Sequence, residues 1–390
     1  MTVNTAQWEA AGLYDPHDPD AADRLALLEY LTERGASLEQ MVEAHRLGSL
    51  PGVAGELVTR VDTPLVPVKE IAERSGVVVP RVLRALLAAG IPATPDSEVP
   101  ADLVHLVTAF EQASALMGDE AVLAFTRVMG ATAINIAEAA VALFYAELGP
   151  GTEREGATEL ERAKVAEAAT RAFTTVPGIV SRMVEDQFKR AQGRALVERE
   201  WAEPHPGPLA TEQRTAQDVM VALGFVDLVG STAWAQGLSL RDQSLAFARF
   251  ESAAWSSSIL AGGRVVKMIG DEVFFAAPTA DAACRIGIEV CRAAAEDPVL
   301  PPARGVVGVG LAIPREGDYF GPLVNQLSRM VKIGGPNELV VTEEAAKELT
   351  PDDWLCEPLE PAELRGIVGE IRAFRVTHRP GGGQATALDP

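Results

Sequence analysis

Apolar residues recur at intervals of three and four over much of the chain between about residues 20 and 200. The clearest examples are DRLALLEYLTERG, SLEQMVEAHRLG and DLVHLVTAFEQASALMG, at residues 23–35, 37–48 and 102–118, each ending in glycine. This spacing is typical of amphipathic helices, and glycine commonly ends a helix. The front half of the chain is therefore predicted to be an all-α domain, a bundle of helices.

Two segments of the helical half differ from the rest. Residues 64–92 show the helix, glycine turn, helix order of a helix-turn-helix, and they resemble the start of MerR-like DNA readers. Their basic residues are sparse and alternate with acidic ones, which favours a structural module over a DNA reader. Residues 119–148 are so rich in Ala, Val, Ile and Leu that more than one helix face is apolar. We favour a bundle core or a dimer seam for this helix over the wall of a lipid-sized pocket.

The spacing changes from helical to strand-like after a proline-rich segment. The sequence AEPHPGPLATEQ at residues 202–213 breaks any helix, and the composition of the C-terminal tail is flexible. We therefore expect a helical domain at residues 1–190, a linker at 191–212, a second domain at 213–379 and a tail at 380–390.

Two apolar strands of the second domain each lead to an aspartate. The segment FVDLVGST at 225–232 places Asp227 before a turn of small residues, and KMIGDEVFF at 267–275 places Asp271 at a hairpin turn. Paired strands would bring both carboxylates together. Two Mg²⁺ or Mn²⁺ ions that share such oxygens clamp the attacking and leaving oxygens of a phosphoryl displacement. The pattern predicts a two-metal site that acts on a nucleoside triphosphate.

Each motif has a simpler explanation when it is taken alone. Asp227 is compatible with a helix N-cap, and Gly270-Asp271 with an ordinary hairpin turn. A third segment, GDYFGPLVNQLSRM at 317–330, adds Asp318, Asn325 and Arg329, spaced by seven and then four residues. The three segments together favour a catalytic site over three unrelated structural features.

These segments resemble the catalytic domain of class III nucleotidyl cyclases, over roughly residues 215–378 and in the same order and spacing. The resemblance implies an α+β domain with a ferredoxin-like βαββαβ core. It also implies that Asp227 and Asp271 hold two Mg²⁺ or Mn²⁺ ions per site. Backbone N–H groups of the turn at 229–232, at an expected helix N-terminus, can cradle the phosphates.

The same resemblance implies roles for five further residues. Lys267 and Asp318 would select the base, Asn325 would position the ribose, and Arg329 would stabilise the transition state. Arg365 would bind the triphosphate, at a position where relatives commonly carry Lys.

Hydrogen-bond chemistry indicates ATP as the substrate. Adenine offers a donor at N6 and an acceptor at N1, which match an ionised Asp318 that only accepts and a Lys267 that only donates. Guanine would place a ring N–H opposite Lys267 and a carbonyl oxygen opposite Asp318, so these groups would stay unpaired. Each unpaired buried polar group costs roughly 1–3 kcal/mol. We expect an adenylyl cyclase that converts ATP to 3′,5′-cyclic AMP and pyrophosphate.

Two other functions stay open at this point. The IGDEV turn faintly resembles the GGDEF turn of diguanylate cyclases, although Ile stands in place of the first Gly. The second is a nonenzymatic nucleotide-binding regulator, which would require a lost catalytic residue, and none is evident.

The class III resemblance also implies a homodimer. The metal aspartates of one chain would face Lys267, Asp318, Asn325 and Arg329 of another, so a symmetric pair would hold two equivalent sites. A monomer would then be inactive.

Composition and charge restrict the partners and the location. With 47% hydrophobic and 23% charged residues in 390, the chain can form two globular cores. A net charge of −21 argues against a nucleic-acid partner. Three cysteines without CxxC spacing suit a reducing cytoplasm, and Cys284 and Cys291 are predicted to be core thiols. We expect no signal peptide, no integral membrane segment and a cytoplasmic location.

The order of a helical domain, a hinge and a cyclase domain resembles mycobacterial two-domain adenylyl cyclases whose N-terminal half inhibits the enzyme and responds to pH. A proton or a lipid is therefore a candidate regulator of the helical domain. Among five histidines, we favour His205 in the hinge as the sensor, because histidine titrates in the range over which cells acidify.

Overall fold

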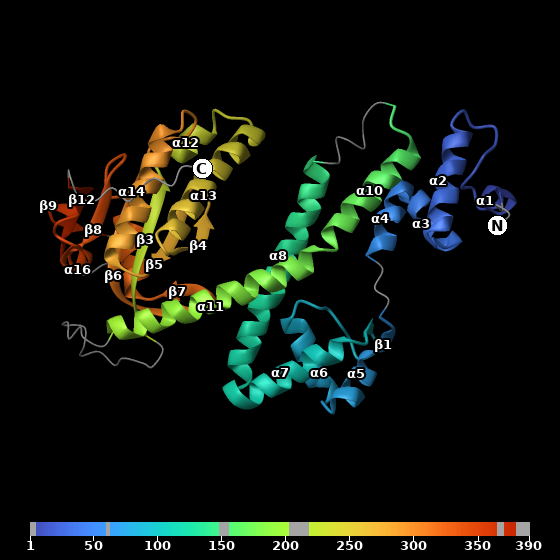
Figure 1. Ribbon diagram of the computed structural model, residues 1–390, viewed down its shortest axis with the longest axis horizontal. Coiled ribbons are helices and arrows are strands. Elements are labelled where there is room, and N and C mark those ends of the chain that lie inside the picture. The colour runs from blue at the N-terminus through green and yellow to red at the C-terminus, as the bar shows by residue number, and fades with distance from the viewer. Residues whose placement is uncertain (1–4, 60–62, 148–155, 203–217, 365–369, 380–390) are drawn as a thin grey trace. The chain divides into compact units, whose positions relative to one another are not determined.

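The computed structural model describes residues 5–59, 63–147, 156–202, 218–364 and 370–379. The chain forms two compact units, Met1–Gln187 and Phe188–Pro390. The first unit consists mainly of helices and the second contains a sheet flanked by helices, so the predicted fold class is confirmed (Figure 1). Helix α11 (Val176–Ala202) runs through the first part of the predicted linker. The rest of that linker and the tail at 380–390 lie outside the described residues.

The N-terminal helices enclose a small core together with a helix from much later in the chain. Helices α2 (Ala21–Glu33) and α4 (Val53–Val58) pack against α10 (Glu159–Phe173). The side chains of Leu27 and Leu31 are fully buried here, as their helical spacing predicted. The neighbouring elements are α1 (Thr5–Ala10), α3 (Leu38–Arg46) and the 3-10 turn η1 (Leu50–Gly52).

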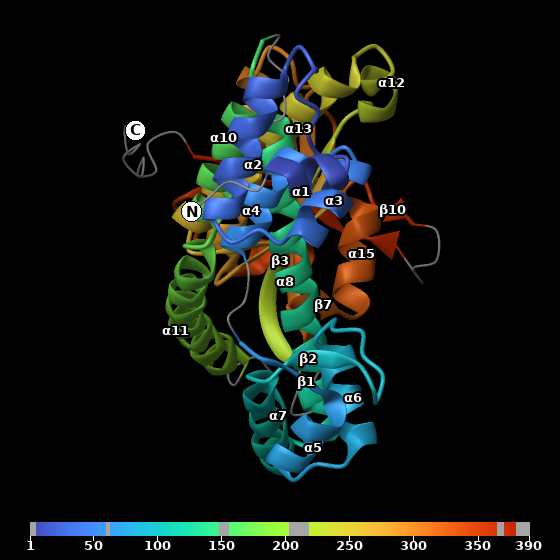
Figure 2. The same ribbon diagram turned by 90° about the vertical axis from the view of Figure 1, so that its right-hand side faces the viewer.

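The predicted helix-turn-helix forms a second, separate core in the same unit. Helix α5 (Val68–Ser75) ends at Gly76, whose φ of 71° is readily adopted by glycine, and α6 (Val79–Ala88) follows. Figure 2 shows these helices gathered with the remaining elements of this core. Those elements are β1 (Leu65–Pro67), β2 (Glu98–Pro100) and α7 (Leu103–Met117). The single bundle that we expected is thus divided into separate cores.

The arginines of α6 are paired with carboxylates of this unit. Arg81 donates to Glu111 and, through two nitrogens, to Asp119 at 2.7 and 2.8 Å, and Arg84 donates to Glu120 at 2.7 Å. These pairings agree with a structural role for the module. The absence of a nucleic-acid partner stays a prediction.

Helix α8 (Asp119–Glu147) has its buried residues in its first half. Val122 and Leu123 pack against Phe110 of α7, whereas Ile134 and Val141 are exposed. The expectation of a helix central to the bundle is therefore wrong for the second half of α8, and a dimer seam stays a prediction.

Within the described ranges, one helix is long and apolar enough to cross a membrane by length and composition alone. It is the stretch Asp119–Phe144, with a hydropathy of 1.3 and 6% of its apolar window buried inside the chain. One such helix is weak evidence, so the expected absence of a membrane segment and the expected cytoplasmic location stay predictions.

The second unit is built on a sheet of eight strands with the order β4-β5-β3-β6-β8-β12-β9, to which β7 adds by pairing with β6. The succession β3, α13, β4, β5, α14, β6 gives the predicted ferredoxin-like βαββαβ core. The strands are β3 (Val219–Leu228), β4 (Arg264–Ile269), β5 (Glu272–Ala277), β6 (Ala303–Arg315), β7 (Asp318–Phe320), β8 (Leu339–Thr342), β9 (Trp354–Pro358) and β12 (Ala373–His378), with a separate pair β10 (Ala362–Glu363) and β11 (Glu370–Ile371). The helices are α12 (Ser231–Ala235), α13 (Leu240–Leu260), α14 (Ala280–Glu296), α15 (Pro322–Met330) and α16 (Glu343–Glu348).

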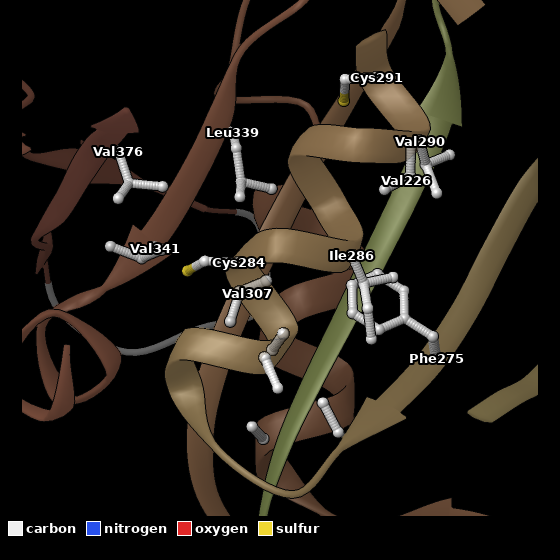
Figure 3. Close-up of a cluster of buried hydrophobic side chains, with 14 of the residues drawn as sticks. Val226, Phe275, Cys284, Ile286, Val290, Cys291, Val307, Leu339, Val341 and Val376 are labelled. Carbon is white, nitrogen blue, oxygen red and sulfur yellow. The ribbon is translucent and has the colours of Figure 1, made fainter. Parts of the chain in front are cut away.

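Strand β3 separates two cores, because its side chains alternate between the two faces of the sheet. On one face, Val226 belongs to a buried cluster with Phe275 of β5 and Ile286 and Val290 of α14 (Figure 3). The other face carries Phe225, which stacks on Phe274 with ring centroids 4.5 Å apart and is covered by α15. The odd-numbered residues of β3, and with them Asp227, therefore belong to the α15 face.

The two cysteines of α14 are core thiols, as the sequence predicted. Cys284 and Cys291 are both buried on the α14 face. Burial raises the pKa of the Cys291 thiol to about 12, because the thiolate would lose its hydration there.

A charged cluster joins α2 to α10 in the first unit. Glu167 accepts hydrogen bonds from Tyr30 of α2, from Arg34 just after the end of α2, and from Arg171 of its own helix at 2.8 Å. The Arg34 guanidinium also stacks on the Tyr30 ring at 3.4 Å. The hydrogen bond from Tyr30, helped by the two arginines, lowers the pKa of Glu167 from 4.5 to about 2.

We expect Glu167→Gln to lower the free energy of unfolding at neutral pH by about 1–3 kcal/mol, because two cations lose their anionic acceptor. Since the folded pKa of Glu167 lies below its ordinary value of 4.5, its contribution is complete above that pH and is lost as pH falls towards about 2. Urea unfolding of both full-length proteins across this range measures the difference. A difference that does not shrink with acid would contradict the assignment.

Candidate active site

Asp227 lies at the end of β3 on the α15 face of the sheet. Its register partners are Glu272 on β5 and Arg304 on β6. Arg304 donates to Asp227 Oδ2 from Nη2 at 3.0 Å and from Nε at 3.3 Å. The N-cap of α12 is Gly230, so Asp227 does not act as the helix cap that was the simpler reading of its motif.

Asp271 occupies the turn between β4 and β5 and meets the end of β3. Gly270, with a φ of 65°, makes the turn, and the Leu228 N–H donates to the Asp271 carbonyl at 3.2 Å. Ser231, which is 6% exposed and begins α12, donates its hydroxyl to Asp271 Oδ2. The structure therefore brings Asp271 to the same end of the sheet as Asp227.

A third carboxylate, that of Glu272, lies beside these two. Its pKa is raised from 4.5 to about 7, first by burial and then by the negative charges of Asp227 and Asp271. The Lys332 and Arg304 cations act in the opposite direction. Negative charge is thus concentrated at the end of β3, where a cation would be favoured.

The chemistry of these groups fits a hard divalent cation. Carboxylate oxygens are the protein ligands that Mg²⁺ prefers, and it commonly takes only one or two of them together with substrate phosphates. Over the part of the chain that the structure describes, no group of three or more His, Cys, Asp or Glu side chains is arranged to hold a metal by itself. Asp227 and Asp271 are the residues that would hold the ions.

The turn after β3 departs in part from the phosphate cradle that we expected. The Val229 N–H donates to the Pro302 carbonyl at 2.8 Å, so it is engaged within the chain. Gly230 follows with a φ of 72° and leads directly into α12. Only residues 230–232 of the expected cradle could therefore offer backbone donors.

Lys267 and Asp318 are brought together from distant parts of the chain. Lys267 lies on β4 opposite Phe274, and Asp318 begins β7. The Lys267 ammonium donates to Asp318 Oδ2, while Asp318 Oδ1 accepts the Tyr319 N–H at 2.7 Å. With side chains 45% and 22% exposed, the pair presents a donor beside an acceptor at the sheet surface.

Asn325 and Arg329 lie one helical turn apart on the exposed side of α15. The opposite side of this helix, with Leu323 and Leu327, packs on β6 at Gly308. A Cβ at Gly308 would lie only 2.7 Å from Leu327 Cδ2, so glycine is needed for the close approach. The helix that carries both residues is thereby fixed on the same sheet face as Asp227. Arg365 lies outside the described residues.

Sequence reasoning missed three residues of this site. Arg304 is a single charged residue at the start of the apolar strand β6, and a charge in such a place could have indicated a paired, functional side chain. Glu272 follows Asp271 directly in the chain, and Ser231 belongs to the turn already singled out. Their contacts with Asp227 and Asp271 depend on strand register, which the sequence did not give.

The first unit matches a known family. Residues 6–191 match the family described as the adenylate cyclase regulatory domain. The pH-sensitive adenylate cyclase of Mycobacterium tuberculosis is 28% identical and covers 94% of this chain and 92% of its own length. An uncharacterized protein of the same species is 26% identical over 98% of this chain and 96% of that protein.

Further relatives match less than half of the chain. An adenylate cyclase of Glutamicibacter nicotianae is 32% identical over 42% of this chain and 40% of that protein. A solved adenylyl cyclase of P. aeruginosa matches 43% of this chain and 98% of its own, with 18% identity and a TM-score of 0.39. The sequence relatives confirm the resemblance to adenylyl cyclases with an N-terminal regulatory domain that the motifs predicted.

Proposed function

We propose that this chain is an adenylate cyclase, which converts ATP to 3′,5′-cyclic AMP and pyrophosphate. The observation that carries the proposal is the convergence of Asp227 and Asp271 at one end of the sheet, on whose α15 face the Lys267–Asp318 pair also lies. The relatives named adenylate cyclase support the same enzyme class.

Asp227 and Asp271 would hold Mg²⁺ or Mn²⁺, two ions per site. When bound, such ions lower the pKa of the ribose 3′-hydroxyl and offset the charge of the triphosphate. The remaining task of the protein is to keep the 3′-oxygen in line with the α-phosphorus, and no protein nucleophile is needed. Asn325 would orient the ribose, and the planar guanidinium of Arg329 would neutralise charge that develops on phosphorus. Arg365 would bind the triphosphate.

The Lys267–Asp318 pair would read the base. Because the two side chains are adjacent, a single adenine edge can receive a hydrogen bond at N1 from the ammonium and donate one from N6 to the carboxylate. A diguanylate cyclase binds guanine, which does not match this donor and acceptor. A nonenzymatic regulator would form no cyclic product.

We expect Lys267→Glu combined with Asp318→Cys to lower the use of ATP by about ten- to a hundredfold and to raise the ratio of GTP to ATP turnover, because donor and acceptor are exchanged. The measurement is product formation from each nucleotide with Mn²⁺, identified as cyclic AMP or cyclic GMP. Lys347→Glu, which reverses the charge of an exposed lysine on α16, is the matched control and should keep ATP selectivity. Unchanged ATP selectivity in the double variant would show that the base is read elsewhere.

We further propose that the site is shared between two chains of a homodimer. In support, Asn325 and Arg329 are exposed on α15 and thus accessible to a second chain. The metal carboxylates of one chain would then act with Lys267, Asp318 and α15 of its partner.

Mixing Asp227→Ala chains with Arg329→Ala chains should restore activity that neither variant has alone. Each heterodimer would hold one intact site, so random mixing should return about a quarter of the activity of the unaltered protein. The heterodimer fraction is measured with two affinity tags. Mixtures that stay inactive despite verified heterodimers would contradict a shared site.

We propose that the first unit regulates the second, with pH as the signal. The match of residues 6–191 to a regulatory domain family and the pH-sensitive relative support this proposal. Our preferred sensor, His205, lies outside the described residues. A histidine can shift two states only if its proton affinity differs between them, and a pKa difference of about one unit gives a tenfold shift.

A chain that begins at Thr211 should be more active at neutral pH than the full chain. Acidification should activate the full chain and leave the shorter chain without a comparable gain, because protonation favours the state with the higher histidine pKa. Activity against pH for both chains and for His205→Ala is the measurement. Identical profiles for the full and shortened chains would exclude pH sensing by the first unit.

A further inference from the structure

The cation nearest to Asp227 is supplied by the chain itself. The Arg304 guanidinium directs both Nη2 and Nε at Asp227 Oδ2, and the two side chains are only 20% and 15% exposed. Arg304 stands directly opposite Asp227 in the register of β3 and β6, so the contact is set by the sheet. One of the oxygens expected to bind a metal ion is thus occupied by an arginine.

The surroundings explain why a cation belongs at this position. Asp227 has Glu272 as its register partner on β5, and Asp271 lies next to the end of β3. Without Arg304, Asp227 would stay partly buried beside these carboxylates and would lose its ion pair. An uncompensated charge in such a place is more costly than at the surface, and attracts any cation that can reach it.

We propose that Arg304 is a built-in counter-ion that competes with the divalent metal for Asp227 when no nucleotide is bound. The inference rests on the proposed function, since it takes Asp227 as a metal ligand. Because guanidinium and metal need the same carboxylate oxygen, Arg304 keeps the metal affinity of the empty site low. A polyphosphate that arrives with its own negative charge gives the guanidinium another anionic partner, so metal loading is linked to nucleotide binding.

This competition predicts that removal of Arg304 raises the affinity for the metal. Removal of an arginine that only stabilises the site would lower that affinity. The full-length variant Arg304→Gln should bind Mn²⁺ about tenfold more tightly than the unaltered protein in the absence of nucleotide, since removal of one charge-assisted interaction is of that size. Its melting temperature should be lower without metal and should rise more on addition of Mn²⁺. Free Mn²⁺ is measured by electron paramagnetic resonance during titration, and melting by circular dichroism.

Two further variants make the result specific. Arg249→Gln removes an arginine that is 55% exposed and pairs with Asp297 at 3.4 Å, so it should leave Mn²⁺ binding unchanged. Arg304→Lys keeps the positive charge and should bind Mn²⁺ more weakly than Arg304→Gln. If Arg304→Gln does not fold, the lysine variant takes its place, and it should bind Mn²⁺ more tightly than the unaltered protein, because it lacks the two-nitrogen contact.

The outcomes separate this inference from the proposed function. If Asp227→Asn weakens Mn²⁺ binding but the folded Arg304 variants bind no more tightly than the unaltered protein, the metal site stands and the counter-ion is refuted. If Asp227→Asn leaves Mn²⁺ binding unchanged, the metal site at Asp227 fails and the inference fails with it. An absence of measurable binding to both the unaltered protein and the Arg304 variants also refutes the counter-ion.

Discussion

The pairing of β3 on both of its edges is the constraint on which the rest of the second unit depends. Antiparallel pairing with β5 and β6 continues along this strand as far as Asp227. Side-chain alternation then places Val226 in one core and Phe225 in the other. A shift by one residue would bury Asp227 beneath α14. The burial of Phe225 against Phe274 therefore determines which way the Asp227 carboxylate points.

Two carboxylates of the site are each paired with a cation of the chain, which carries a net charge of −21. Asp227 is paired with Arg304, and Asp318 with Lys267. Each pair joins residues from different strands, so neither contact can form before the sheet does. A nucleotide that bound at this site, as we propose, would have to replace contacts that these groups already make, which would favour ligands whose charges match both pairs.

The helical unit also contains ion pairs between distant segments, and there they have a structural role. Glu167 ties α10 to α2, and Arg81 ties α6 to α7 and α8, through hydrogen-bonded ion pairs at the edges of small cores. Apolar side chains such as Ile134 on α8 are left exposed within the chain. Small cores joined by polar contacts can rearrange more easily than one large core, which suits a unit that matches a regulatory domain.

The sequence by itself determined the element types, the two cyclase-like aspartates and the Lys267–Asp318 pair. The element types depend on local spacing. The aspartates and the pair were identified because the order and spacing of their motifs resemble a known family. It did not determine that Arg304 faces Asp227, that Glu272 joins them, or that the helical half divides into separate cores. Such contacts join segments far apart in sequence. They form only when strand register and helix packing bring these segments together in the folded chain.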